Sequence, residues 1–174
     1  MGKKLGQEEG NLPILVVKDS ESKRVFSHLV PSKGTAHPYP VKAMIRDVKT
    51  LGYRKFILKG DQEPSIIDVK NDFIVKLGGE VAPDEEPPAI KPEEPPVDNH
   101  QANGSVELAI WSVGSQVRTL EDALEHRYGS PGVSSRPVLY LLIEHAAAII
   151  SRFEVAKDCL SYTTHAPDAA NRAS

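Results

Sequence analysis

The sequence predicts an α/β layered domain, in which helices flank a sheet. Short runs rich in valine, isoleucine, leucine and phenylalanine alternate with longer amphipathic segments, and a 40% hydrophobic content over 174 residues suits one modest core. The single cysteine, Cys159, excludes a disulfide framework and any zinc module that needs several thiolates. No run of about eighteen apolar residues is present, so we expect no membrane span and an intracellular protein.

The first structured part is expected to be a β-hairpin followed by a helix. The apolar runs "LPILVVKD" and "RVFSHLVP" are separated by the polar "SESK", which is typical of two antiparallel strands, with Asp19 at the turn. In "PVKAMIRDVKTLG" the apolar residues recur at helical spacing, and Pro40 and Gly52 suit the first turn and the end of the helix. This helix should pack on a sheet.

A strand and a helix follow. The short apolar run "RKFILKGD" predicts a strand that is buried on both faces. The next segment, "EPSIIDVKNDFIVKLGG", predicts a helix that ends at Gly78 and Gly79. The order of elements up to this point is therefore ββαβα.

An acidic, proline-rich segment separates the two structured parts of the chain. Between Glu80 and Asp98 there are seven acids and one base, and this segment also holds six of the fourteen prolines. Such a composition disfavours both strand pairing and helix, so residues 81–98 are expected to form an extended loop. The rest of the chain is mildly basic, which is too weak by itself to indicate a phosphate-binding surface.

Two helices are expected after the loop. In "VELAIWSVGSQVRTLEDALEHRYG" the apolar residues step by four and three, which predicts a long amphipathic helix that ends before Gly129. The segment "PVLYLLIEHAAAIISRF" is apolar nearly all round, so it should be a buried helix that includes His145 as a core residue. We expect one domain over residues 13–160, with disordered segments at residues 1–12 and 161–174.

Two carboxylates are candidates for a metal site. Asp61 follows a predicted strand, and Glu107 lies on the first turn of the long helix. Functional groups gather at the carboxyl ends of strands in α/β sheets, and Mg²⁺ is usually held by one or two carboxylates. Alternatively, Asp61 is a helix N-cap and Glu107 is an acid favoured by the helix dipole. The spacing alone leaves both interpretations open.

The stretches "LKGDQEPSI" and "NHQANGSVELAIWSVGSQVRTLEDALEHRYG" resemble the corresponding blocks of retrotransposon integrase catalytic domains, which belong to the ribonuclease H-like superfamily. The resemblance extends through "FSHLVPSKG" and covers most of the chain from Pro13 onward. It implies a three-layer domain with a mixed sheet, and an Asp, Asp, Glu triad that binds Mg²⁺ or Mn²⁺ and joins DNA ends.

Site residues follow from this resemblance by position. Asp61 matches the second acid of the triad and Glu107 the third, so the two carboxylates are expected to share a hydrated metal ion. Asn103 and Gly104 match the small polar pair that opens the helix beside the DNA. The resemblance thus gives Glu107 a role as a metal ligand at a helix N-terminus.

The first acid of the triad departs from the family pattern. In the family this acid lies in a first strand, which precedes the hairpin in the sequence. In the sheet, that strand lies between the hairpin and the strand that ends near Asp61. Here only "MGKKLGQEEGN" precedes the hairpin, and Leu5 is its one apolar side chain beyond Met1. Asp19 is the nearby substitute, although turns recruit Asp for backbone reasons. We therefore expect an integrase-core remnant that lacks its first strand, one metal ligand and strand-transfer activity.

The missing first strand leads to a prediction about how the remaining strands pair in the sheet. Either "LPILVVKD" pairs directly with "RKFILK" in a collapsed sheet, or the position of the strand stays empty between them.

Several other residues are candidates for contacts with DNA. Lys33, Lys59 and Arg118 are placed to meet phosphates, although such residues are more often simply solvated. Trp111 is expected to pack in the protein rather than stack on a base. Two functions remain open: an integrase remnant, nuclear if functional, with DNA as partner and self-assembly left open, or a noncatalytic module that binds nucleic acid or oligomerises.

Overall fold

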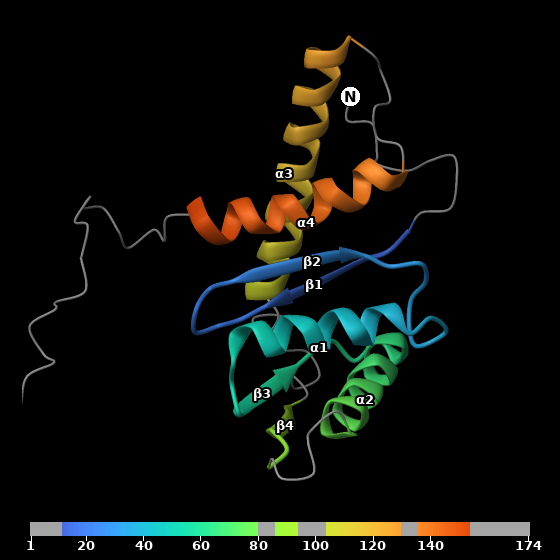
Figure 1. The fold of residues 1–174 in the computed structure, drawn as a ribbon, viewed down its shortest axis with the longest axis vertical. Helices are drawn as coiled ribbons and strands as arrows, with labels where there is room; N and C mark the ends of the chain where they lie inside the picture. The colour runs from blue at the N-terminus through green and yellow to red at the C-terminus, as the bar shows by residue number, and fades with distance from the viewer. Residues whose placement is uncertain (1–11, 80–85, 94–103, 130–135, 154–174) are drawn as a thin grey trace, which may run out of the picture.

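The computed structural model describes residues 12–79, 86–93, 104–129 and 136–153 (Figure 1). The predicted disordered segments, apart from Leu12, lie outside these residues. The described residues form four helices and two small sheets, which confirms the mixed α/β class. The elements in chain order are β1 (Ile14–Lys18), β2 (Val25–Leu29), α1 (Tyr39–Leu51), β3 (Lys55–Lys59), α2 (Pro64–Gly79), β4 (Ala89–Glu93), α3 (Gly104–Tyr128) and α4 (Arg136–Phe153).

The predicted hairpin is confirmed. Strands β1 and β2 pair antiparallel in a register that runs from Ile14 opposite Leu29 to Lys18 opposite Val25. Asp19 lies at the turn, where its carboxylate accepts hydrogen bonds from the backbone N–H of Ser22 at 2.8 Å and from the Tyr53 hydroxyl at 2.9 Å. Burial raises the pKa of Asp19, but hydrogen bonds from the hydroxyl and backbone N–H of Ser22 and from Tyr53 outweigh it and lower the pKa overall. Asp19 is thus a turn residue.

Helix α1 begins and ends where the sequence predicts. Pro40 lies in its first turn, where a missing backbone N–H costs nothing. Gly52 ends the helix with a φ of 74°, a left-handed conformation that glycine adopts without strain, and its N–H bonds to the Val48 carbonyl at 3.1 Å.

The acidic, proline-rich segment contains a strand, so the loop prediction is wrong for Ala89–Glu93. Strand β4 pairs parallel with β3, from Ala89 opposite Lys55 to Glu93 opposite Lys59. Each strand of this sheet has only one neighbour among the described residues, and an edge strand tolerates a proline such as Pro92 because one side of its backbone needs no partner.

Strand β3 is not buried on both faces as predicted. Phe56 and Leu58 are half-buried and face a core, whereas Ile57 on the other face is 53% exposed. The helices that pack on this sheet, α1 and α2, cover only the face of Phe56 and Leu58.

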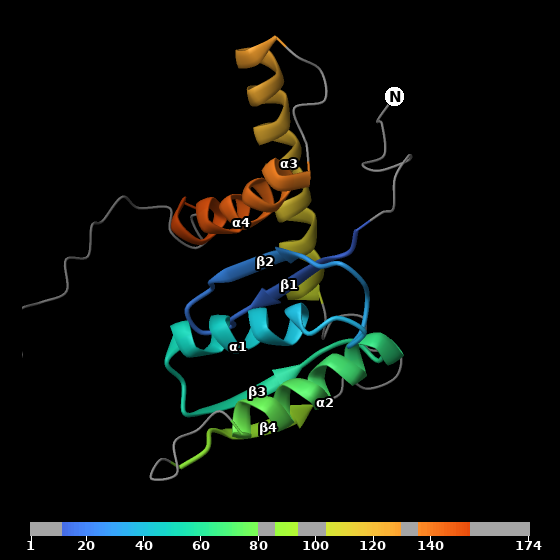
Figure 2. The ribbon, with the colours of Figure 1, turned by 45° about the vertical axis from the view of Figure 1, so that its right-hand side comes forward.

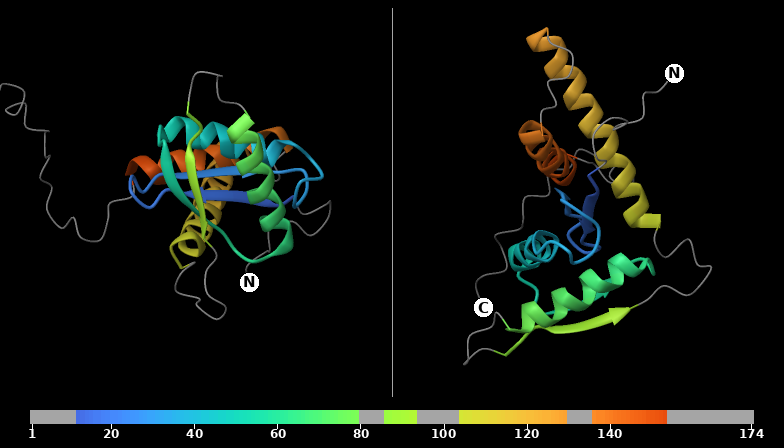
Figure 3. Two further views of the ribbon diagram at one scale, coloured as in Figure 1. Left: turned by 90° about the horizontal axis from the view of Figure 1, so that it is seen from below. Right: turned by 90° about the vertical axis from the view of Figure 1, so that its right-hand side faces the viewer.

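The two sheets are separate within the described residues, because β1 pairs only with β2 and β3 only with β4. The collapsed sheet, in which β1 would pair with β3, is therefore wrong. One core nevertheless joins the two sheets: Leu15 and Val17 of β1 and residues of β3 and β4 pack against side chains of α1 and α2, and α1 lies between the hairpin and β3 (Figure 2). The strands of the two sheets run in clearly different directions (Figure 3).

A second core lies between the hairpin, α3 and α4. Helix α3 ends before Gly129 as predicted, and its C-terminal part extends beyond α4 (Figure 1). Val113 and Val117 of its apolar stripe are buried, whereas Val106 and Ile110 are 37% and 52% exposed. Of the helices that the structure describes, none is long and apolar enough to cross a membrane.

Helix α4 is not buried all round. It packs across β2 and α3 with one face, which carries Ile143 and Ala146 among its buried residues. Leu141 is 70% exposed and His145 is exposed, so the prediction of a core histidine is wrong. Its exposed large apolar side chains, Leu141 and Phe153, lie outside this core.

Candidate functional site

The structure gives the surroundings of the two predicted metal ligands. Asp61 is exposed in the segment between β3 and α2, where its carboxylate accepts the backbone N–H of Gln62 at 2.7 Å. It is not the N-cap of α2, because that helix begins at Pro64 and its first amides bond to the carbonyl of Glu63. Glu107 is exposed on the first turn of α3.

Helix α3 begins near the hairpin, since Lys18 Nζ donates to the carbonyl of Ser105 at 3.4 Å. The N-terminal end of α3 lies on the side of the molecule where β4 ends, and β3 runs parallel to β4 (Figures 1 and 3). Gly104 is the first residue of α3, whereas Asn103 lies outside the described residues. A shared metal site between Asp61 and Glu107 stays a prediction.

The chemistry of the described acids does not complete the predicted triad. No group of three or more His, Cys, Asp or Glu side chains in the described part of the chain is arranged to hold a metal ion. Asp61 and Glu107 supply at most two carboxylates, whereas the resemblance implies three. We therefore assign no metal-dependent step to these residues.

The predicted phosphate-binding residues lie on the surface. Lys33 pairs with Glu63 at 2.9 Å and Lys59 pairs with Glu93 at 2.8 Å, and such exposed ion pairs contribute little to stability. Arg118 is exposed on α3, where its guanidinium donates to the Ser115 hydroxyl at 3.1 Å.

Trp111, also on α3, is 67% exposed, so the prediction that it packs inside the protein is wrong. Its helix position lies off the apolar stripe that contacts the core.

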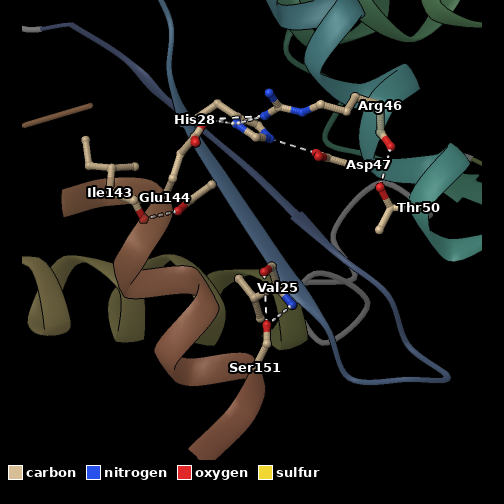
Figure 4. Close-up of polar contacts among 9 residues, drawn as sticks. Val25, His28, Arg46, Asp47, Thr50, Ile143, Glu144 and Ser151 are labelled. Atoms are coloured by element: carbon tan, nitrogen blue, oxygen red, sulfur yellow. Dashed lines mark hydrogen bonds and ion pairs between the residues drawn. The ribbon is translucent and has the colours of Figure 1, made fainter. Parts of the chain in front are cut away.

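A buried polar cluster joins β2, α1 and α4, and the sequence analysis did not predict it (Figure 4). His28 of β2 is 3% exposed and Asp47 of α1 is 2% exposed. The Nε2 atom of His28 lies 2.7 Å from the Asp47 carboxylate, and Nδ1 lies 3.1 Å from the carboxylate of Glu144 on α4. Arg46 Nη2 donates to Glu144 at 3.2 Å and also lies 3.3 Å from His28 Nδ1.

The two carboxylates determine the charge of His28. Burial lowers the pKa of this imidazole, but the hydrogen bonds and charges of Asp47 and Glu144 outweigh it and raise the pKa above 6.5. Burial likewise raises the pKa of Glu144, and His28 and Arg46 outweigh that effect and lower it. When His28 is charged, both ring nitrogens donate to carboxylates. When it is neutral and keeps its Nε2 proton, Nδ1 is free to accept from Arg46.

This arrangement is that of a structural link. A general base needs one ring nitrogen aimed at a reacting group, but both nitrogens of His28 are occupied. The neighbouring Ser27 is no nucleophile for it, because its hydroxyl donates to the Ile143 carbonyl at 2.7 Å. The two carboxylates lie on opposite sides of the ring, so they cannot join one imidazole nitrogen in binding a single metal ion.

Two serines extend the link between β2 and α4. Ser151 of α4 accepts the backbone N–H of Val25 at 2.9 Å and donates to the Val25 carbonyl at 3.0 Å, while Ser27 of β2 bonds back to α4. No buried side-chain nitrogen or oxygen in the described residues lacks a hydrogen-bond partner. The hairpin is thus tied to both helices by a complete polar network.

One sequence signal could have found this cluster. Asp47 lies three residues after Met44 and among the apolar positions of α1, so helical spacing places a carboxylate on the buried face of that helix. The partners are not local, because His28 is 19 residues from Asp47 and Glu144 is 116 residues from His28.

Comparison with known proteins identifies no relative for this chain: no family model matches it, and no curated protein matches its sequence.

Proposed function

We propose that this chain is the remnant of an integrase-type catalytic domain that no longer transfers DNA strands. The observation that carries the proposal is the division of the sheet between β1 and β3. The resemblance implies a first strand, which bears the first catalytic Asp, between these two strands. Among the described residues β1 pairs only with β2 and β3 only with β4, so each of these strands has one edge without a strand partner, although side chains of both strands join one core with α1 and α2.

The placement of the two remaining acids supports the same proposal. Asp61 comes two residues after the end of β3, and Glu107 lies on the first turn of α3. These are the positions that the resemblance assigns to the second and third acids. Two-metal catalysis needs carboxylates that hold both ions, and the resemblance assigns only two of its three acids to the described residues, so we do not expect strand transfer.

Activity is the first test of this proposal. The purified chain is incubated with a labelled duplex oligonucleotide and Mg²⁺ or Mn²⁺, and nicked and joined products are separated on a denaturing gel. We expect no product above the background of Glu107→Ala, with Asp122→Asn on the same helix as the matched acid control. Cleavage that depends on Glu107 but not on Asp122 would contradict the loss of activity. Asp19 and Asp47 would then be tested as replacements for the first acid of the triad.

DNA binding is the positive test. A remnant that keeps its DNA surface should bind the duplex in fluorescence anisotropy, and binding should weaken with salt. Arg118→Gln should reduce the affinity more than Arg127→Gln, because these residues lie nine positions apart and thus on opposite sides of α3. Equal affinity of both variants and the wild type would remove Arg118 from the proposed surface.

The gene itself distinguishes a remnant from an independent noncatalytic module. An apolar strand that contains Asp, encoded upstream of Met1 in the same reading frame, would support the integrase origin. A stop codon followed by promoter sequence at that position would favour a module that only binds nucleic acid or oligomerises.

A further inference from the structure

A cavity of about 280 Å³ lies beside the His28 cluster, between the start of β2, the second half of α1 and the C-terminal half of α4. Three arginines contribute to its wall, and each belongs to a different part of the fold: Arg24 directly precedes β2, Arg46 lies in α1 and Arg152 lies in the last turn of α4. We call this cavity the three-arginine pocket. No residue of its wall comes from β3, α2 or α3, so it is distinct from Asp61 and Glu107.

The acids of the wall do not neutralise these arginines. Asp47 and Glu144 are the wall's two acids, and both bind His28. Of the three arginines, only Arg46 pairs with one of them, at 3.2 Å from Glu144. Within the described residues Arg24 and Arg152 form no ion pair, although Arg24 lies over the ring of Phe26 at 5.9 Å. The wall therefore carries an excess of positive charge, even with His28 neutral.

The remaining wall favours recognition by charge. The hydroxyl of Ser151 is committed to Val25, and the hydroxyl of Thr50 donates to the Arg46 carbonyl at 2.9 Å. Ala147 and Ala148 provide small apolar surface on α4. The three arginines are exposed, so their guanidinium groups are accessible to an anion from solvent. Arg24 and Arg152 are thus the charged groups of the wall that no acid of the wall occupies.

We propose that the three-arginine pocket binds a phosphate group. A guanidinium presents two parallel N–H donors that match the oxygens of phosphate, and clusters of arginine recognise phosphorylated ligands. The volume, about 280 Å³, is just below the roughly 300–1,000 Å³ typical of small-molecule sites, which suits a compact anion better than a whole nucleotide. The phosphate belongs either to a small phosphate compound or to the terminus of a nucleic-acid strand.

The first experiment measures binding to the full chain by isothermal titration calorimetry, with inorganic phosphate and pyrophosphate as probes at constant ionic strength. We expect saturable binding that weakens at least about tenfold in the double variant Arg24→Gln/Arg152→Gln, since each removed guanidinium takes away charge-assisted hydrogen bonds. Arg127→Gln, an exposed arginine at the far end of α3, should stay within about twofold of the wild type. No saturable binding of either probe, or an equal loss in Arg127→Gln, would overturn the proposal.

Two additions keep the test decisive. Circular dichroism melting verifies that the variants fold, and the single variants Arg24→Gln and Arg152→Gln replace the double variant if it does not. A 5′-phosphorylated oligonucleotide is compared with its 5′-hydroxyl form. Tighter binding of the phosphorylated form, lost with the same arginines, assigns the pocket to strand termini, whereas binding of pyrophosphate alone assigns it to small phosphate compounds. Neither result depends on Glu107 or Arg118, so this proposal and the integrase proposal can fail separately.

Discussion

The buried pair of His28 and Asp47 allows the most quantitative prediction. Asp47→Ala removes one partner of a contact in which Nε2 and Oδ2 lie 2.7 Å apart and both residues are at most 3% exposed. Breaking a buried charged pair costs about 3–5 kcal/mol of unfolding free energy. Glu144 still binds the other ring nitrogen, so we expect the lower end, about 3 kcal/mol. Asp47→Asn keeps an acceptor and should cost about 1–2 kcal/mol.

The pH dependence follows from the raised pKa of His28. A histidine whose pKa is higher in the folded state than in the unfolded state contributes stability that is complete below the unfolded pKa, which is about 6.5. That contribution is lost as the pH rises through the folded pKa. Glu144 behaves oppositely, because its pKa is lowered: its contribution is present above about pH 4.5 and is lost as the pH falls through its folded pKa. The network is therefore strongest in the mildly acidic range between the two transitions.

Urea unfolding at pH 5.5 and pH 8 tests this reasoning. The difference in unfolding free energy between the wild type and Asp47→Asn should be largest at pH 5.5 and smaller at pH 8, where neutral His28 can accept from Arg46 instead. Asp72→Asn is the control, because its pair with Lys76 lies at the surface and should be worth less than about 0.5 kcal/mol at either pH. An effect of Asp47→Asn that does not change with pH would refute the assignment of a raised pKa to His28.

Two further substitutions test the cores and the polar link. Phe73 of α2 is fully buried in the core shared with α1 and the two sheets, so Phe73→Ala should lower the unfolding free energy by about 4 kcal/mol in urea titration. Val75→Ala is the control, because Val75 is 73% exposed and its substitution should change the unfolding free energy by less than about 0.5 kcal/mol. Ser151→Ala leaves the backbone N–H and C=O of Val25 without their side-chain partner. We expect it to lower the unfolding free energy by about 1–3 kcal/mol and to speed hydrogen exchange of the Val25 amide. Unchanged exchange would show that water replaces the hydroxyl.

Elements set by neighbouring residues were predictable from the sequence. The apolar runs "ILVVK" and "VFSHL", with polar residues and a turn-forming Asp19 between them, were enough to predict the hairpin. The end of α1 at Gly52 follows from the left-handed backbone that glycine permits. In each case the physical cause lies within a few residues, so a local pattern contains it.

Strand β4 shows where local patterns fail. Acids and prolines disfavour a strand by composition, yet Ala89–Glu93 pairs with β3 because a partner more than thirty residues earlier supplies the hydrogen bonds. The same applies to the His28 cluster, whose third member comes from α4. The helical spacing of α1 places Asp47 on the buried face of that helix, but it does not identify His28 as the residue that pairs with the carboxylate.

The apolar stripe of α3 connects these observations to the proposed origin of the chain. The stripe was predicted as one continuous surface, yet Val113 and Val117 are buried while Val106 and Ile110 remain exposed. The exposed part is next to the first turn, where Lys18 at the end of β1 contacts Ser105. A helix keeps an apolar stripe where something covers it, and exposed apolar side chains at that spacing are typical of a surface that contacts a further element or a partner. The exposed end of the stripe and the second edge of β1, which has no strand partner among the described residues, are both explained if the proposal of a lost first strand is right.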